Sequence, residues 1–120
     1  MADIVLTRVL PGGAINTGVI SVSNRYDVAR MPTIEGGHNS AVLIATDARQ
    51  EGIVHRFNFR MRASGARAKQ TLTGMKQFFN RHGLKAGDQI TIYLVQELKL
   101  LGKVIRPAVY SIDFERRAVA

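Results

Sequence analysis

Residues 53–62 read Ile-Val-His-Arg-Phe-Asn-Phe-Arg-Met-Arg, and this stretch decides the fold class. Its residues alternate between a mainly apolar set and a mainly polar set. The first set is Ile53, His55, Phe57, Phe59 and Met61, and the second is Val54, Arg56, Asn58, Arg60 and Arg62. Because successive side chains of a strand point to opposite faces, the pattern predicts a β-strand with one core face and one cationic, solvent-exposed face.

Six further stretches have the short length and composition of β-strands. They are residues 4–10, 18–22, 41–46, 70–72, 89–96 and 109–114. Residues 97–103 leave two alternatives open: continuation of the preceding strand, or a hairpin turn at Gly102. The strands follow one another too closely for helical crossovers, so mostly antiparallel pairing is expected. Closure into a small barrel would leave few open edges.

One helix is expected at residues 74–83, Gly-Met-Lys-Gln-Phe-Phe-Asn-Arg-His-Gly. Met75, Phe78 and Phe79 have the i, i+3, i+4 spacing of an apolar helix face, and Gly83 is placed to end the helix.

A second, short helix is expected at residues 24–31, after the candidate N-cap Ser23 and before Pro32. Residues 11–13, Pro-Gly-Gly, predict a turn that stops the first strand, and residues 84–88 predict another turn.

The length of 120 residues allows one domain, residues 1–120, in which 115–120 are expected to be a frayed tail or the start of a linker. A hydrophobic content of 46% can form a core, and no apolar run is long enough to cross a bilayer. The N-terminal residues do not resemble a secretory signal. The absence of cysteine excludes disulfides, thiolate metal sites and cysteine nucleophiles.

The charge points to an anionic partner. Seventeen Lys and Arg against nine Asp and Glu give a net charge of +8, and arginines predominate. Between residues 49 and 69 there are six basic residues, which are Arg49, Arg56, Arg60, Arg62, Arg67 and Lys69, and a single acid, Glu51. A solvated face normally mixes the two signs, so this segment is expected to bind anions, with nucleic acid as the first candidate and an anionic membrane as the second.

The sequence contains no clear motif for catalysis or for cofactor binding. His38, His55 and His82 show no metal-ligand spacing, so no metal site and no cofactor are expected, and His55 is expected to be a hydrogen-bonded core histidine. No serine has a G-x-S-x-G environment, and the glycine pairs do not match a phosphate-binding loop.

A magnesium-dependent nuclease is the remaining catalytic alternative. Asp88 followed by Glu97-Leu98-Lys99 has the acid…E-x-K order in which two carboxylates bind the cation. Asp88 is typical of the turn predicted at Gly87-Asp88, so its presence does not require a catalytic role. The chain is therefore expected to be non-catalytic.

The run from His55 to Tyr93 closely resembles the second half of the B3 DNA-binding domain. Its motifs are His55-Arg56-Phe57-Asn58-Phe59, Leu72-Thr73-Gly74-Met75-Lys76-Gln77-Phe78 and Leu84-Lys85-Ala86-Gly87-Asp88. The N-terminal half is similar to the family's first strands and helix, and residues 109–114 resemble its closing strand. The resemblance implies a mainly β (α+β) fold, a seven-stranded open pseudobarrel with two short helices. His55 and Met75 stand where the plant family usually has Trp, which favours the bacterial relatives.

The resemblance also implies two arms that grip the major groove of duplex DNA. The N-terminal arm would present Asn16, Thr17, Ser21, Ser23, Asn24 and Arg25. The C-terminal arm would present Arg60, Arg62, Ser64, Arg67, Lys69 and Gln70. Arg56, Lys76 and Arg81 are further candidates for phosphate contacts.

The expected function is therefore sequence-specific binding of double-stranded DNA, as the recognition or effector domain of a type II restriction endonuclease. A nuclease domain in the same polypeptide would be its partner. The alternatives are a freestanding transcriptional regulator and a nuclease that uses Asp88 and Glu97. No membrane partner is expected, and the chain is expected to be a monomer that is cytoplasmic in a bacterium and nuclear in a eukaryote.

Overall fold

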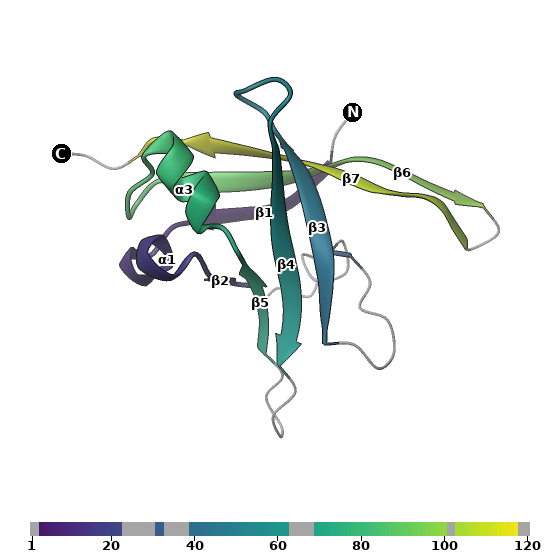
Figure 1. Ribbon diagram of the computed structural model, residues 1–120, viewed down its shortest axis with the longest axis horizontal. Coiled ribbons are helices and arrows are strands. Elements are labelled where there is room, and N and C mark those ends of the chain that lie inside the picture. The colour runs from purple at the N-terminus through teal and green to yellow at the C-terminus, as the bar shows by residue number, and fades with distance from the viewer. Residues whose placement is uncertain (1–2, 23–30, 33–38, 63–68, 101–102, 118–120) are drawn as a thin grey trace.

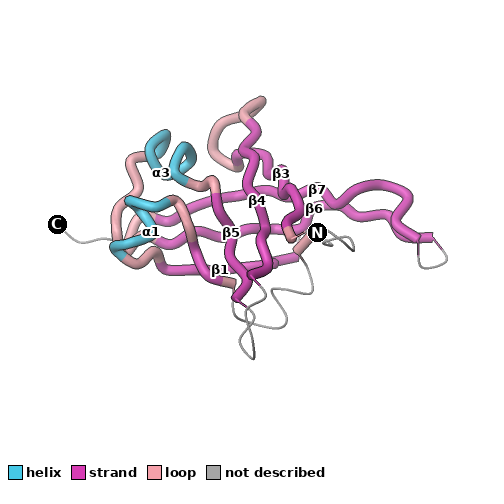
Figure 2. Tube along the Cα trace, turned by 60° about the horizontal axis from the view of Figure 1, so that its bottom comes forward, coloured by secondary structure: helices cyan, strands magenta, loops and turns pink. Residues whose placement is uncertain are grey.

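The computed structural model describes residues 3–22, 31–32, 39–62, 69–100 and 103–117. Its described elements are β1 (Asp3–Val9), α1 (Gly12–Thr17), β2 (Ile20–Ser21), β3 (Ser40–Asp47), β4 (Val54–Arg62), β5 (Lys69–Thr73), α3 (Lys76–His82), β6 (Gln89–Leu100) and β7 (Lys103–Glu115). The strands form one sheet in the order β1-β6-β7-β3-β4-β5-β2. The sheet curls, and the two helices lie together at one end of it (Figures 1 and 2).

Most of the strand pairs are antiparallel, as expected, and β3 and β7 pair in parallel. Residues 97–100 continue β6, and β7 begins at Lys103, so the two strands form a long hairpin that extends away from the rest of the sheet (Figure 1). The alternative that residues 97–103 continue the preceding strand is therefore right for residues 97–100, and Gly102, where the other alternative put a turn, lies outside the described residues.

The core lies inside the curled sheet and under α3. Phe57 and Phe59 of β4 are buried, as are Phe78 and Phe79 of α3. The Phe78 ring packs edge-on against Phe57 at a centroid distance of 6.3 Å. The apolar faces predicted for residues 53–62 and 74–83 are thus the faces that meet in the core.

The helix at residues 74–83 is confirmed, although its first helical residue is Lys76. It ends at Gly83, which has φ of +62°, a left-handed conformation that suits glycine. The expected helix at 24–31 lies outside the described residues, apart from Met31, which is buried.

Helix α1 corrects the sequence interpretation, which had a turn at residues 11–13. Pro11 has an extended backbone and precedes the helix, and Gly18 ends it with φ of +70°. Buried Ala14 anchors this short helix. A Cβ on Gly18 would lie 2.7 Å from the Lys76 backbone N, so α1 ends in close contact with the start of α3. A six-residue helix is barely stable in isolation, so packing against the rest of the protein must stabilise α1.

In the described residues, no helix is long and apolar enough to cross a membrane.

Candidate nucleic-acid interface

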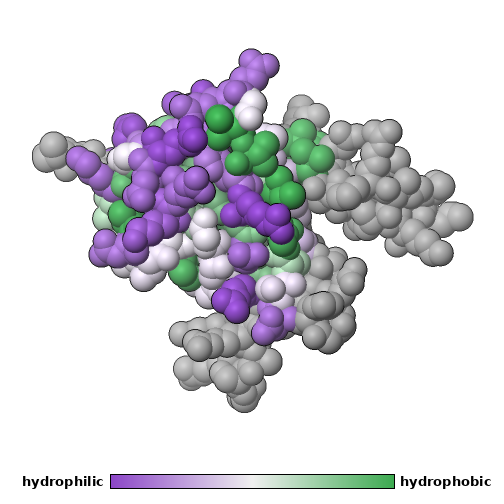
Figure 3. All heavy atoms as spheres, in the orientation of Figure 1, coloured by the Kyte–Doolittle hydropathy of each residue, from purple (hydrophilic) through white to green (hydrophobic). Residues whose placement is uncertain are grey.

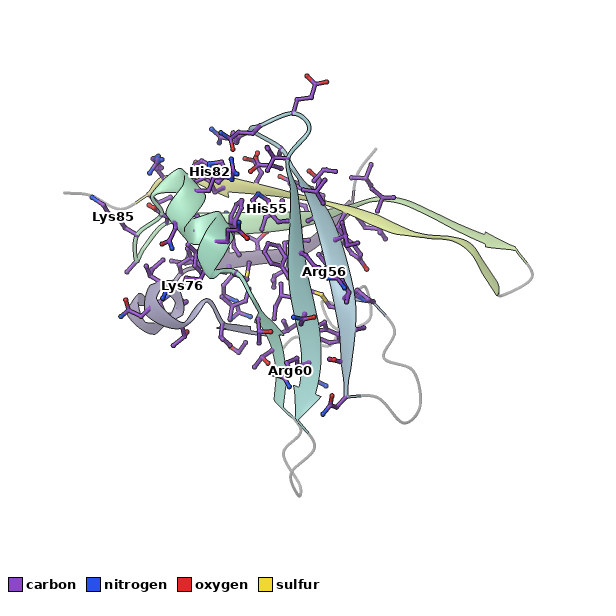
Figure 4. All side chains as sticks on the ribbon, viewed as in Figure 1. His55, Arg56, Arg60, Lys76, His82 and Lys85 are labelled. Atoms are coloured by element: carbon purple, nitrogen blue, oxygen red, sulfur yellow. The ribbon has the colours of Figure 1, made fainter. Side chains whose placement is uncertain are left out.

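The outer face of β4 is polar and exposed. Arg56, Asn58 and Arg60 are all exposed, and they alternate with buried His55 and Phe57. Figure 4 shows Arg56 and Arg60 along the same strand. At about 3.3 Å per residue, four positions separate these two arginines by about 13 Å.

The register of the sheet brings residues of both expected arms into one row. Arg60 pairs with Ser40 on one side and with Thr71 on the other, and Thr71 pairs with Ser21 of β2. Neighbouring strands lie about 4.8 Å apart, so the backbones of Arg60 and Ser21 are about 10 Å apart. We call Ser21, Thr71, Arg56, Asn58 and Arg60 the outer β4 face.

Arg56 and Arg60 have no hydrogen bond or ion pair with any residue in the described ranges. The other arginines whose side chains are described each have a partner. Arg8 bonds to Ser21, Arg49 to Asp113 and Phe114, Arg81 to Gln50, Arg116 to His82 and Gly83, and Arg117 to Gln89. Among the described residues, nothing therefore occupies the guanidinium donors of the outer β4 face, and they can serve a ligand.

Arg49 belongs to the basic segment identified in the sequence, but in the structure its charge is paired with Asp113. Its Nε lies 2.7 Å from Asp113 Oδ1, and this carboxylate raises the pKa of Arg49. Its guanidinium also stacks over the Phe114 ring at 4.6 Å. Charge counting along the chain cannot separate this arginine from Arg56 and Arg60.

The first residues of the expected N-terminal arm lie on helix α1. Asn16 and Thr17 are exposed. The Thr17 hydroxyl donates to the Gly13 carbonyl and accepts from the Val19 backbone N–H, so it stabilises the end of α1. Exposed Lys76 lies close to this junction, beside Gly18.

Arg8 is a residue that the sequence analysis missed. It lies on β1, one edge of the sheet, and its guanidinium donates to the carbonyl of Ser21 on β2, the other edge. It therefore bridges the opening of the curled sheet and holds Ser21 in place. Nothing in its local sequence, Thr-Arg-Val, indicates this long-range contact.

Two expected site residues lie away from the outer β4 face. Leu72 is buried, and Gln70, two positions before it, points to the same side of β5, opposite to Thr71. Arg81 donates to Gln50 Oε1, in the turn beyond β3 and far along the sheet from Arg60.

The other expected arm residues cannot be placed. Ser23, Asn24, Arg25, Ser64 and Arg67 lie outside the described residues. Arg62 and Lys69 pair in the β4–β5 ladder, and their side chains are not described.

A buried polar cluster lies on the inner side of β4. Asp47 Oδ2 is 2.8 Å from His55 Nε2 and 2.6 Å from His82 Nε2. Burial opposes ionisation of Asp47, but the hydrogen bonds from both histidines and from the Arg49 backbone N–H outweigh it and lower its pKa to about 2. His55 is therefore the hydrogen-bonded core histidine that its position predicted.

The side chain of Asp88 also has a structural role. Its side chain is buried, and its two oxygens accept hydrogen bonds from the backbone N–H groups of Lys85 and Arg117. These bonds close the turn before β6.

The sheet order, its curl and its two helices define a B3-like pseudobarrel. The fold class expected from the sequence is confirmed.

Solved structures similar to this chain include two complexes with DNA. An Arabidopsis FUS3–DNA complex is 18% identical, with a TM-score of 0.73, and the match covers 96% of this chain and 99% of that one. The Arabidopsis thaliana transcription factor LEC2–DNA complex is also 18% identical, with a TM-score of 0.67 and coverage of 78% and 84%. No family model and no curated protein matches the sequence.

Proposed function

We propose that this protein binds double-stranded DNA sequence-specifically through the outer β4 face, together with residues of the two expected arms. The observation that supports this most directly is the state of Arg56 and Arg60. They are exposed on one strand face without partners in the described structure, whereas other described arginines are bonded internally. A net charge of +8 adds long-range attraction for a polyanion.

Each residue of this face has a role that follows from its chemistry. A guanidinium can bond guanine O6 and N7 together, or grip a phosphate. Asn58 can read adenine through N6 and N7, and the hydroxyls of Ser21 and Thr71 suit phosphate oxygens. The exposed aliphatic residues beside them on β3, Val42 and Ile44, can contact thymine methyl groups. Figure 3 shows apolar side chains along β3 beside hydrophilic ones along β4.

Of the two biological contexts expected from the sequence, we favour the freestanding transcriptional regulator. One similar structure is a transcription factor bound to DNA, and the other is also a DNA complex. Neither lends support to the restriction endonuclease context. The bonded state of Asp88 argues against cleavage by this chain itself.

Selection of the 120-residue chain on a pool of random duplexes tests the proposal. We expect enrichment of one short motif, and a preference for that motif over scrambled duplex in fluorescence anisotropy at fixed salt. Binding to all duplexes with equal affinity would refute sequence specificity. Magnesium-dependent cleavage of the selected duplex that is abolished by Glu97→Gln would restore the nuclease alternative.

A further inference from the structure

Three ligand-type side chains from separate elements converge behind the outer β4 face. Asp47 ends β3, His55 is near the start of β4 and His82 is the last residue of α3. One potential ligand atom from each residue, a carboxylate oxygen or a ring nitrogen, lies within 4.8 Å of the other two. The side chains are nearly inaccessible, with 0%, 5% and 7% exposure respectively. Figure 4 shows His55 and His82 on the same side of the molecule, near the end of α3.

The hydrogen bonds determine how these groups are arranged. The other oxygen of Asp47, Oδ1, accepts from the backbone N–H groups of Arg49 and Gln50, so the carboxylate is fixed in orientation. An ionised carboxylate only accepts hydrogen bonds, so both histidines donate to it through Nε2–H. One carboxylate oxygen thus holds two imidazoles whose Nε2 atoms point at the same place.

This arrangement is close to a tetrahedral zinc site. Zinc binds histidine nitrogen at about 2.0–2.1 Å and carboxylate oxygen at about 2.0–2.2 Å, which places neighbouring ligand atoms about 3.3 Å apart. The present N···O distances are 2.8 Å and 2.6 Å. An ion could therefore enter if the nitrogens of His55 and His82 moved away from the oxygen by about 0.5 Å and about 0.7 Å.

Aromatic rings pack around the cluster. The rings of Phe78 and Phe114 pack against the two imidazoles, at 4.8 Å from His55 and 4.6 Å from His82, so the shell is apolar. Of the two guanidinium groups over the Phe114 ring, that of Arg49 is neutralised by Asp113, and that of Arg116 bonds to the end of α3.

We propose that Asp47, His55 and His82 form a site for one Zn²⁺, with a water molecule as the fourth ligand. The ion would tie the C-terminus of α3 to the β3–β4 hairpin. Binding moves the imidazole proton of each histidine from Nε2 to Nδ1, so no redox partner is needed. The site is not evident from the sequence, because its three ligands are separated along the chain and belong to different elements.

The test uses the full chain after treatment with a chelator and needs no DNA. Calorimetric titration with zinc chloride should give one site per chain, and thermal unfolding should shift to higher temperature in proportion to the logarithm of free zinc. Titration with Co²⁺ should produce visible absorption bands typical of a tetrahedral ion.

His82→Gln should lower the zinc affinity at least about tenfold, because one of three protein ligands is lost. His38→Gln is the matched control, since it removes the remaining histidine of the sequence, which is not among the three proposed ligands, and it should bind zinc as the unmodified chain does.

Nuclear magnetic resonance of the imidazole nitrogens gives a readout that does not depend on any variant folding. Zinc should move the proton of His55 and His82 from Nε2 to Nδ1 and leave His38 unchanged. If neither zinc nor cobalt binds stoichiometrically, or if both imidazoles keep their Nε2 protons at saturating zinc, the cluster is only a hydrogen-bond network and the proposal is wrong.

Discussion

The two faces of strand β4 differ in what they bond to. On the inner face, His55, Phe57 and Phe59 are buried, and even the polar member of this set is hydrogen-bonded to Asp47. On the outer face, Arg56 and Arg60 are exposed without partners in the described residues.

Stability and binding are therefore expected to depend on different faces of β4. The described side chains of the inner face are buried in the core, so substitutions there should alter the free energy of unfolding. The outer face contributes little to the fold, so changes there should alter affinity for DNA. Separation of the two effects is possible because adjacent residues of one strand point to opposite sides of the sheet.

The largest expected effect is on the inner face. Phe57→Ala removes a ring that is 1% exposed and packs against Phe78, and it should lower the free energy of unfolding by about 3–5 kcal/mol. Chemical denaturation measures this change. Val54→Ala is the control, because Val54 is 57% exposed, and its effect should stay within about 0.5 kcal/mol. Equal losses in both variants would contradict the assignment of the faces.

A smaller effect is expected on the outer face. Arg60→Ala should weaken binding to the selected duplex by about 1–3 kcal/mol, or about 5- to 150-fold in Kd, if Arg60 contacts a base, and leave the unfolding midpoint unchanged. Anisotropy at fixed salt measures the affinity. Arg117→Ala removes the same charge from a residue that bonds to Gln89, and it should change Kd by less than about twofold. An equal loss in Arg117→Ala would mean that only net charge matters.

A third variant changes stability while both faces stay intact. Gly74 has φ of +80°, and an added Cβ would meet the Arg56 carbonyl oxygen at an ordinary 3.6 Å. Gly74→Ala should therefore cost only the left-handed backbone strain, about 1–2 kcal/mol of unfolding free energy. The Kd of the folded protein should not change. A weakened Kd would show that the backbone of β4 shifts and that the two faces are coupled.

The smallest expected effect is on salt dependence. If Arg56 neutralises one phosphate, Arg56→Ala should reduce the slope of log affinity against log salt concentration by about 0.9. Titrations from low to moderate salt measure the slope. An unchanged slope in Arg56→Ala would remove this residue from the phosphate contacts.

Several elements could be predicted from the sequence because their signals are local. Alternation in residues 53–62 and the spacing of Phe78, Phe79 and Gly83 each report which side of one strand or helix is buried. Helix α1 was missed, because its glycines indicate a turn and its helical state depends on packing against α3. The exposure of Arg56 and Arg60 was also predictable from the alternation.

Most of the arrangement of the site could not be predicted. Arg49 and Arg60 belong to the same basic segment, yet one is paired with Asp113, 64 positions away, and the other is free of partners in the described ranges. Arg8 looked like an ordinary strand residue until the fold placed it against Ser21.

The chain alone determined the strand periodicity, the helix that ends at Gly83 and the excess of positive charge, because these depend on neighbouring residues and on composition. The tertiary structure decided the row from Ser40 through Arg60 to Ser21, the bridge made by Arg8 and the meeting of Asp47 with His55 and His82. These contacts join residues that are distant along the chain. Their partners are set by how the sheet curls and which strands pair, and local propensity contains no information on either.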